Sequence, residues 1–194
     1  MELGGDSLRK IDAEKRRIRT EAGKRIRGLS DKELLNAKEE IEQEIESLPE
    51  FQKAGVIMCY FPLSEEVGTD GLIRKARESG KIIALPVLLN QEEILPYEYK
   101  GRALLVKSRL GIWEPDKNTA KEIEVNKLDL VIVPGRAFSR DNHRLGRGKG
   151  CYDRFLKKLP KRTYKIGIAF KCQVFDTLPF NPLRDEKVDI VLSA

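Results

Sequence analysis

Short apolar runs that alternate with amphipathic stretches constrain the fold of this chain more than any other feature. The run GVIMCY (residues 55–60) has the length and composition of a buried strand, and so has KIIALPVL (81–88). Between them, an amphipathic stretch starts at Thr69, which can cap a helix, and ends at Gly80, which can stop one. A strand, a helix and a strand in this order predict two parallel strands joined by a right-handed crossover.

The same alternation continues toward the C-terminus. Apolar runs at residues 128–134, 163–170 and 188–193 have strand character, and an amphipathic stretch over residues 151–159 predicts a helix between the first two. We therefore predict an α/β fold, an open and mostly parallel sheet flanked by helices on both faces.

Three shorter segments are less regular. Residues 93–99 and 102–106 predict a hairpin or an edge of the sheet. Residues 111–125 contain a proline and several polar residues, and they predict a loop or linker.

The first part of the chain is predicted to be helical throughout. Apolar residues recur every three, four or seven positions in two stretches. Ser30 opens an S-x-x-E capping box at the start of the second stretch, and Pro49 ends that helix. We expect residues 1–49 to form a helical hairpin packed on an α/β core of residues 50–194, and residues 1–194 to form a single domain.

Charge is distributed unevenly along the chain. The formal net charge is +6, yet residues 136–171 alone contain twelve lysines and arginines against two acids. Such polarity favours a focused anion site over general coating of nucleic acid. No apolar run approaches the roughly 20 residues that cross a bilayer, so we expect a cytoplasmic protein that does not bind membranes.

The three cysteines predict neither a disulfide framework nor a zinc site, because their number is odd and no C-x-x-C pair occurs. Cys151 lies beside two cations at the predicted start of a helix, and both features lower the pKa of a thiol. The alternative is a small residue without a chemical role.

The segment RLGRGKGCYDRFL has the composition of an anion-binding loop. Gly146, Gly148 and Gly150 alternate with Arg147 and Lys149. Alternate glycines permit positive φ and let backbone N–H groups approach an oxyanion closely, and the start of the following helix adds further N–H groups. A predicted strand precedes the loop, as at the crevice where open sheets bind ligands. We predict that the loop binds a phosphate; a flexible surface turn is the alternative.

Asp153 follows this loop in the first turn of the predicted helix. It either compensates the helix dipole or binds an Mg²⁺ ion that also binds the phosphate. Asp185, in the turn before the last predicted strand, is a candidate second carboxylate.

Two other charged pairs have two interpretations each. Lys15 and Arg19 lie four residues apart on the first predicted helix, where like charges repel unless an anion lies over them; a solvated basic face is the alternative. Glu65 and Glu66 follow the first predicted strand and therefore lie at a carboxyl end of the sheet; solvated loop acids are the alternative.

A resemblance to a known family rests on five segments in order. The segment VPGRAFSRDNHRLGRGKGCYDRFL resembles the signature of the 5-formyltetrahydrofolate cyclo-ligases, also called methenyltetrahydrofolate synthetases. The resemblance extends over almost the whole chain, through KRRIR at 15–19, YFPLSEEVGT at 60–69, GIWEP at 111–115 and DEKVDIVL at 185–192. The glycine-loop segment is the most specific of the five.

This resemblance implies ATP-dependent closure of 5-formyltetrahydrofolate to 5,10-methenyltetrahydrofolate, with release of ADP and phosphate. It implies ATP and a reduced folate as partners and Mg²⁺ as the metal. We also expect a monomer. The resemblance implies catalytic roles for Arg147 and Lys149, and Mg²⁺ ligation by Asp153 and Asp185. The implied ATP-binding residues are Lys15, Arg19, Arg144, Leu145, Gly146, Arg147, Gly148, Lys149, Gly150, Cys151 and Tyr152. The implied folate-binding residues are Phe61, Glu66, Arg147, Gly148, Lys149, Gly150 and Cys151.

This sequence departs from the family pattern at several positions. Arg136, Ser139, Asn142 and Cys151 stand where the family more often has Leu, Asp, Gly and Tyr, and Gly68 stands where it more often has Asp. None of these departures removes a predicted phosphate or metal contact.

Two other functions remain alternatives at this point. One is a phosphate-binding enzyme similar to sugar-phosphate isomerases, because related sheets support several activities. The other is a basic RNA-binding protein, although the glycine loop lacks the interleaved aromatic residues that stack on bases.

Overall fold

A six-stranded sheet forms the centre of the computed structural model, which describes residues 5–90, 92–108 and 111–194. The strand order is β11-β9-β6-β1-β2-β3, and every neighbouring pair is parallel except β2 and β3. The strands are β1 (Val56–Met58), β2 (Ile82–Leu89), β3 (Glu93–Glu98), β6 (Leu130–Val133), β9 (Tyr164–Ala169) and β11 (Ile190–Ser193). The predicted open, mostly parallel sheet is therefore confirmed, with β3 as its antiparallel edge.

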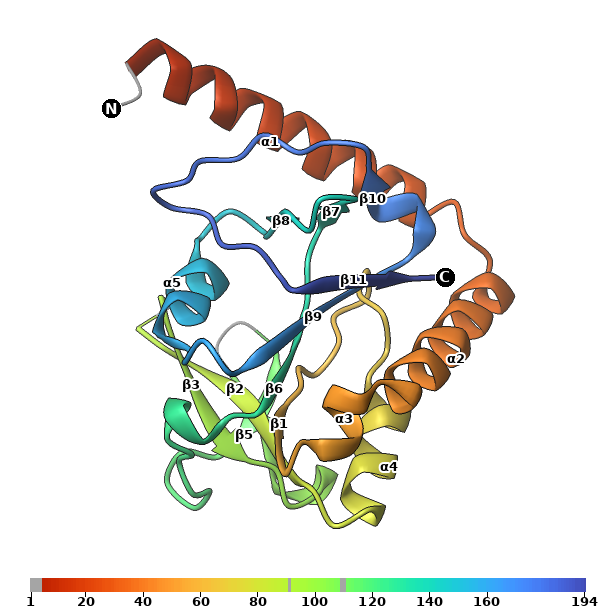
Figure 1. The fold of residues 1–194 in the computed structure, drawn as a ribbon, viewed down its shortest axis with the longest axis vertical. Helices are drawn as coiled ribbons and strands as arrows, with labels where there is room; N and C mark the ends of the chain where they lie inside the picture. Colours follow the sequence, from red (N-terminus) through yellow and green to blue (C-terminus); the bar gives the residue numbers. More distant parts are fainter. Residues whose placement is uncertain (1–4, 91, 109–110) are drawn as a thin grey trace.

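Helices cover both faces of this sheet (Figure 1). On one side lie α2 (Asp31–Ser47), α3 (Pro49–Lys53) and α4 (Asp70–Glu78), and on the other lies α5 (Cys151–Lys158). Side chains alternate between the faces along each strand. In β6, Leu130 and Ile132 join the cluster under α2–α4, while Val131 and Val133 join the cluster under α5. Burial on both faces explains why these strands are continuous apolar runs.

The predicted strand, helix and strand unit is confirmed by β1, α4 and β2, which pair in parallel from Val56 opposite Ile82. Thr69 occupies the position before α4, but its hydroxyl does not cap the helix. It donates instead to the Tyr60 carbonyl at 2.5 Å. Thr69 therefore ties together the two ends of the loop that follows β1.

The N-terminal helices form as predicted but diverge from each other. The Ser30 capping box is present at the start of α2. The first helix, α1 (Gly5–Ile26), packs against β7 (Ala137–Ser139) and the 3₁₀ turn η3 (Lys171–Gln173), whereas α2 packs against α3 and β11. Figure 1 shows the two helices at an open angle across different parts of the core. No helix within the described residues is long and apolar enough to cross a membrane.

A small second sheet contributes the two strands that precede the glycine loop in the chain. Its strand order is β10-β7-β8, with β8 at Arg144–Leu145 and β10 at Val174–Phe175. The sequence predicts the loop directly after the strand that is now β6. In the structure, the β7–β8 hairpin lies between β6 and the glycine loop in the chain. Because α1 packs on β7, this hairpin lies between the N-terminal helix and the central sheet (Figure 1).

The prediction of a loop over residues 111–125 is wrong in part. Trp113–Pro115 forms β5, which pairs antiparallel with β4 (Leu105–Lys107). The 3₁₀ turns η1 (Arg102–Leu104) and η2 (Val125–Lys127) flank this pair in the chain. β5 also packs against β2, so GIWEP is part of the folded domain rather than a linker.

Replacing Gly167 with alanine is expected to lower the free energy of unfolding by about 1–3 kcal/mol, because it overpacks the core. A Cβ on Gly167 would lie 2.5 Å from Cε1 of Phe138, which is fully buried. Gly55→Ala is the matched control, since its Cβ would meet Asp129 Oδ2 at an ordinary 3.6 Å. Denaturant unfolding measures both, and equal losses in the two variants would refute the packing explanation.

Candidate active site

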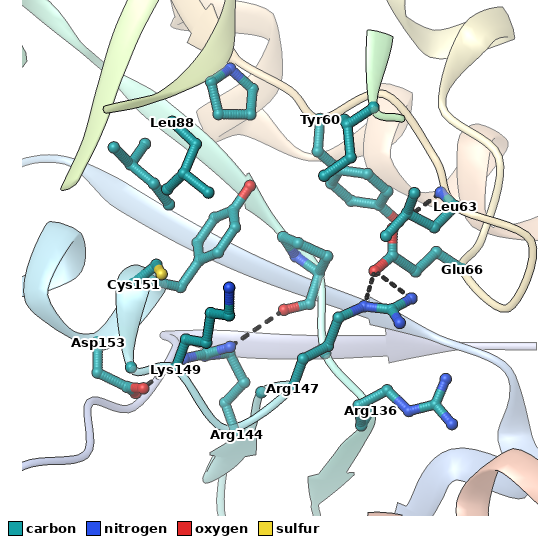
Figure 2. Close-up of a pocket in the computed structure, with 18 of the residues that line it drawn as sticks. Tyr60, Leu63, Glu66, Leu88, Arg136, Arg144, Arg147, Lys149, Cys151 and Asp153 are labelled. Atoms are coloured by element: carbon teal, nitrogen blue, oxygen red, sulfur yellow. Dashed lines mark hydrogen bonds and ion pairs between the residues drawn. The ribbon is translucent and has the colours of Figure 1, made fainter. Parts of the chain in front are cut away.

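A pocket of about 390 Å³ lies where β1 and β6 end, at the carboxyl edge of the parallel strands. This is the edge at which open α/β sheets bind ligands. Its walls come from the loop after β1, from β2, β3 and β5, and from the glycine loop and the start of α5 (Figure 2). The lining residues are Tyr60, Phe61, Leu63, Glu66, Pro86, Leu88, Ile94, Ile112, Glu114, Pro134, Gly135, Arg136, Arg144, Gly146, Arg147, Lys149, Gly150, Cys151, Tyr152 and Asp153.

The glycine loop has the backbone geometry that its sequence predicts. Gly148 has φ +111° and Gly150 has φ +68°, which side chains with a Cβ rarely adopt. Gly150 is also the N-cap of α5, so the turn leads directly into the helix N-terminus. Backbone N–H groups at such a turn and helix start are suited to binding an anion.

Helix α1 supplies two cations to this region. The Arg19 Nε donates to the Gly146 carbonyl at 2.8 Å, and its guanidinium lies beside Gly148. Burial lowers the pKa of Arg19, and nearby acids offset this only in part. The buried Lys15 forms an ion pair with Asp185. The alternative of a solvated basic face is therefore wrong for both residues.

Arg144 and Asp153 form a buried ion pair under the glycine loop. The Arg144 Nη2 donates to Asp153 Oδ1 at 2.8 Å, and the side chains are 2% and 13% exposed. The guanidinium also lies over the Tyr152 ring, 5.6 Å from its centre. Within the described part of the chain, Arg144 Nε and the Tyr152 hydroxyl are buried without a hydrogen-bond partner. Both atoms therefore retain unused hydrogen-bonding capacity beneath the pocket surface.

The acids after β1 are not solvated either. Glu66 accepts two hydrogen bonds of 3.2 Å from Arg147, and its Oε2 accepts one of 3.0 Å from the Leu63 N–H (Figure 2). Glu65 pairs with Arg136 and with Arg27, and the hydrogen bond from Arg136 is the largest cause that lowers the pKa of Glu65. These ion pairs attach the loop after β1 to the segments that line the pocket.

Most of the site residues predicted from the sequence meet in this one pocket. Ten of them line it, namely Phe61, Glu66, Arg144, Gly146, Arg147, Lys149, Gly150, Cys151, Tyr152 and Asp153. Gly148 belongs to the glycine loop itself, and Arg19 lies beside that loop. The Leu145 side chain packs instead beneath α1 with Ile18 and Ala22, so it points into the core and not into the pocket.

The two predicted metal ligands both accept hydrogen bonds from the turn that precedes β11. Asp153 Oδ1 also accepts from the Glu186 N–H at 3.3 Å, and Asp185 Oδ2 accepts from the Asn181 N–H at 2.7 Å. Asp153 accepts its hydrogen bonds from Arg144 and Glu186 through Oδ1, and Asp185 accepts those from Lys15 and Asn181 through Oδ2. No group of three or more metal-binding side chains occurs among the residues described. Two carboxylates are the number that Mg²⁺ typically uses when phosphate and water supply its other ligands, so the residues fit such an ion.

Sequence reasoning missed two parts of the site. It missed the ion pairs of Arg136 and Glu65, which join segments 71 residues apart. It also missed Glu114, which lines the pocket from β5. Glu114 belongs to the GIWEP motif, but the prediction of a loop there gave no indication that its carboxylate lines the pocket.

A family model decides between the possible phosphate-binding enzymes. The model of the 5-formyltetrahydrofolate cyclo-ligase family matches residues 11–194, which is nearly the whole chain. The chain belongs to this family. It is thus an enzyme, and the resemblance noted in the five sequence segments is confirmed.

Individual cyclo-ligases and solved structures agree with this assignment. The chain is 31% identical to a 5-formyltetrahydrofolate cyclo-ligase of Mus musculus over 94% of each chain, and 31% identical to one of Haemophilus influenzae over 85% of this chain and 90% of that protein. The NMR structure of a 5,10-methenyltetrahydrofolate synthetase from Aquifex aeolicus is similar, with a TM-score of 0.80 and 33% identity over 92% of this chain and 89% of that one. A synthetase from Mycoplasma pneumoniae gives a TM-score of 0.73 and 27% identity over 91% and 96%. These relatives support folate cyclo-ligase activity.

Proposed function

We propose that this chain catalyses the ATP- and Mg²⁺-dependent cyclisation of 5-formyltetrahydrofolate to 5,10-methenyltetrahydrofolate, with release of ADP and phosphate. One observation carries the proposal. The anion-binding glycine loop shares a single pocket with an apolar wall that can accept a flat ring, so a phosphate donor and a folate can meet there. The family match favours this reaction over sugar-phosphate isomerisation and over RNA binding.

The cations around the glycine loop are suited to the phosphates of ATP. Arg147 and Lys149 line the pocket between glycines whose N–H groups can converge on oxygen atoms. Arg19 holds the loop from α1 through the Gly146 carbonyl. We propose that these residues bind the triphosphate together with Lys15, Arg144, Leu145, Gly146, Gly148, Gly150, Cys151 and Tyr152. For Leu145 we propose a contact through its backbone, since its side chain is in the core.

Folate is proposed to bind against Phe61, Glu66 and the part of the glycine loop from Arg147 to Cys151. Phe61 and Glu66 follow β1 and face the loop across the pocket. The ion pair between Glu66 and Arg147 joins the two sides, so binding of one substrate can orient the loop that binds the other. We also propose that the enzyme is a monomer.

The proposed chemistry is phosphoryl transfer followed by ring closure. The formyl oxygen attacks the γ-phosphorus of ATP, and the bond between that phosphorus and ADP breaks. The N10 amine then attacks the activated formyl carbon, loses its proton, and phosphate leaves with the formyl oxygen. Such transfer depends on in-line positioning and on stabilisation of developing charge, which Arg147 and Lys149 supply. Mg²⁺ bound by Asp153 and Asp185 would neutralise phosphate charge.

Purified protein given Mg²⁺, ATP and 5-formyltetrahydrofolate is expected to produce the absorbance of the methenyl product, because most of the residues proposed to bind ATP and folate line or border one pocket. The assay follows that absorbance together with release of ADP in equal amounts. Omission of ATP, or addition of a chelator, is expected to abolish the signal. Folded protein that yields no methenyl product under these conditions would refute the proposed reaction.

A further inference from the structure

Three carboxylates line the pocket, and one of them differs from the other two. Glu66 is paired with Arg147, and Asp153 is paired with Arg144. Within residues 5–90, 92–108 and 111–194, no ion pair involves Glu114. Glu66 and Asp153 thus each have an arginine partner in the protein, whereas Glu114 has the Leu88 backbone N–H and retains capacity to accept hydrogen bonds from a ligand.

The surroundings of Glu114 are apolar. It shares the pocket wall with Leu88, Ile94 and Ile112. Burial raises the pKa of Glu114, and the Leu88 backbone N–H and the charge of Lys117 offset this only in part. A carboxylate in such a position is unfavourable unless donors satisfy it. A bound ligand that supplies donors would remove this penalty.

Strand β5 fixes where this carboxylate points. Side chains alternate along a strand, so Trp113 and Pro115 lie on one face of β5 and Glu114 on the other. Trp113 is 43% exposed, whereas Glu114 lines the pocket. Pairing of β5 with β4, with Val106 opposite Glu114, holds the strand in this register. The position of Glu114 thus depends on the sheet and not on a loop conformation.

The pocket has two chemically different sides. Arg136, Arg144, Arg147 and Lys149 gather around the glycine loop, and Leu88 lies across from Arg144 and Arg136 (Figure 2). Phosphates belong on the cationic side. A flat ring with an apolar face and a polar edge suits the other side, and its edge would meet Glu114.

The acceptor-only chemistry of a carboxylate indicates which ring it binds. The 2-amino-4-oxopyrimidine part of a pterin has an N–H at position 3 beside its 2-amino group, so two donors point in the same direction. The six-membered-ring edge of adenine places the N1 acceptor beside its amino donor, and that acceptor would repel a second carboxylate oxygen. We propose that Glu114 recognises the pterin ring of the folate by accepting hydrogen bonds from N3–H and the 2-amino group. This inference rests on the proposed function.

Recognition by Glu114 would also set the orientation of the substrate. With the pyrimidine edge held at β5, the rest of the reduced pterin extends toward the glycine loop. The formyl group would then be presented to the phosphate side. Glu114 is thus a residue that determines specificity and contacts the substrate, without a proton-transfer role in the reaction.

Replacing Glu114 with glutamine is expected to raise the Kd of 5-formyltetrahydrofolate about 10-fold or more, because the glutamine NH₂ group opposes the ligand donors. Binding is measured without ATP, by calorimetry or ligand fluorescence, so that no turnover is needed. The KM for ATP is expected to stay within about twofold of the wild-type value, since adenine does not bind there. Glu114→Asp should regain part of the affinity. Glu122→Gln is the matched control, because Glu122 contacts the Tyr97 hydroxyl and does not line the pocket.

A folate analogue without the 2-amino group tests the contact directly. It is expected to bind the wild-type protein about 10-fold more weakly than the parent folate, and to lose little further affinity in Glu114→Ala. Equal losses in wild type and variant would overturn the assignment, as would unchanged folate affinity in Glu114→Gln. An inactive wild-type protein would instead refute the proposed reaction, so the two failures are distinguishable.

Discussion

Replacing Lys149 with alanine is expected to reduce kcat about 100- to 1,000-fold while the fold is kept. Lys149 lines the pocket between Gly148 and Gly150, where its ammonium group can reach the oxygens of a transferring phosphoryl group. Removing one preorganised donor or cation from such a site typically has an effect of this size. Because the interaction strengthens as charge develops, the loss should appear in kcat more than in the KM for either substrate.

Three companion variants show whether charge is the cause. Lys149→Met retains most of the side-chain length without the ammonium and is expected to be as impaired as the alanine variant. Lys149→Arg should recover part of the rate, though a planar guanidinium does not reproduce a point charge. Lys161→Ala removes an exposed cation just beyond α5 and should act like wild type. Near-normal kcat in Lys149→Met would exclude the proposed electrostatic role.

The pattern of apolar residues predicts the central sheet because the burial of each strand is visible in its own residues. Runs such as LVIV in β6 are buried on both faces, so every residue must be apolar and the pattern is plain in the sequence. The β7–β8 hairpin escaped prediction because its strands have two or three residues and polar residues such as Arg140 and Asp141 form its turn. The angle between α1 and α2 depends on what each helix packs against, which no local pattern encodes.

The residues of the candidate site also form two groups, those that the local sequence predicts and those that depend on distant partners. The glycine loop and Asp153 are neighbours in sequence, so spacing and charge were sufficient to indicate an anion site. Burial of Lys15 and Arg19 depends on Asp185 and on the Gly146 carbonyl, which lie 170 and 127 residues away. A basic helix face with distant partners looks the same in sequence as one exposed to water. Long-range pairing is therefore the information that only the structure supplies.

Replacing Asp153 with asparagine is expected to reduce turnover about 100-fold and to shift its dependence on Mg²⁺ to higher concentrations. Asparagine keeps an oxygen that can accept from Arg144 and from the Glu186 N–H, but it removes the negative charge that favours a divalent cation. Initial rates measured across a series of Mg²⁺ concentrations at saturating ATP and folate report both effects. Glu186→Gln is the matched control, because that carboxylate lies beside Asp185 in sequence and contacts Lys157 on the outside of α5.

Asp153→Ala is expected to have a second effect, on stability. Arg144 is 2% exposed and would lose its carboxylate partner, so the free energy of unfolding should fall by about 3–5 kcal/mol. The double variant Arg144→Met with Asp153→Leu removes both charges and should recover most of that loss, because a buried ion pair can often be replaced by apolar residues. Recovered stability without recovered activity separates the structural role of Asp153 from its proposed role at the metal. If Asp153→Asn keeps the wild-type kcat and Mg²⁺ dependence, the proposed metal role is refuted. Asp153 is then only the ion-pair partner of Arg144.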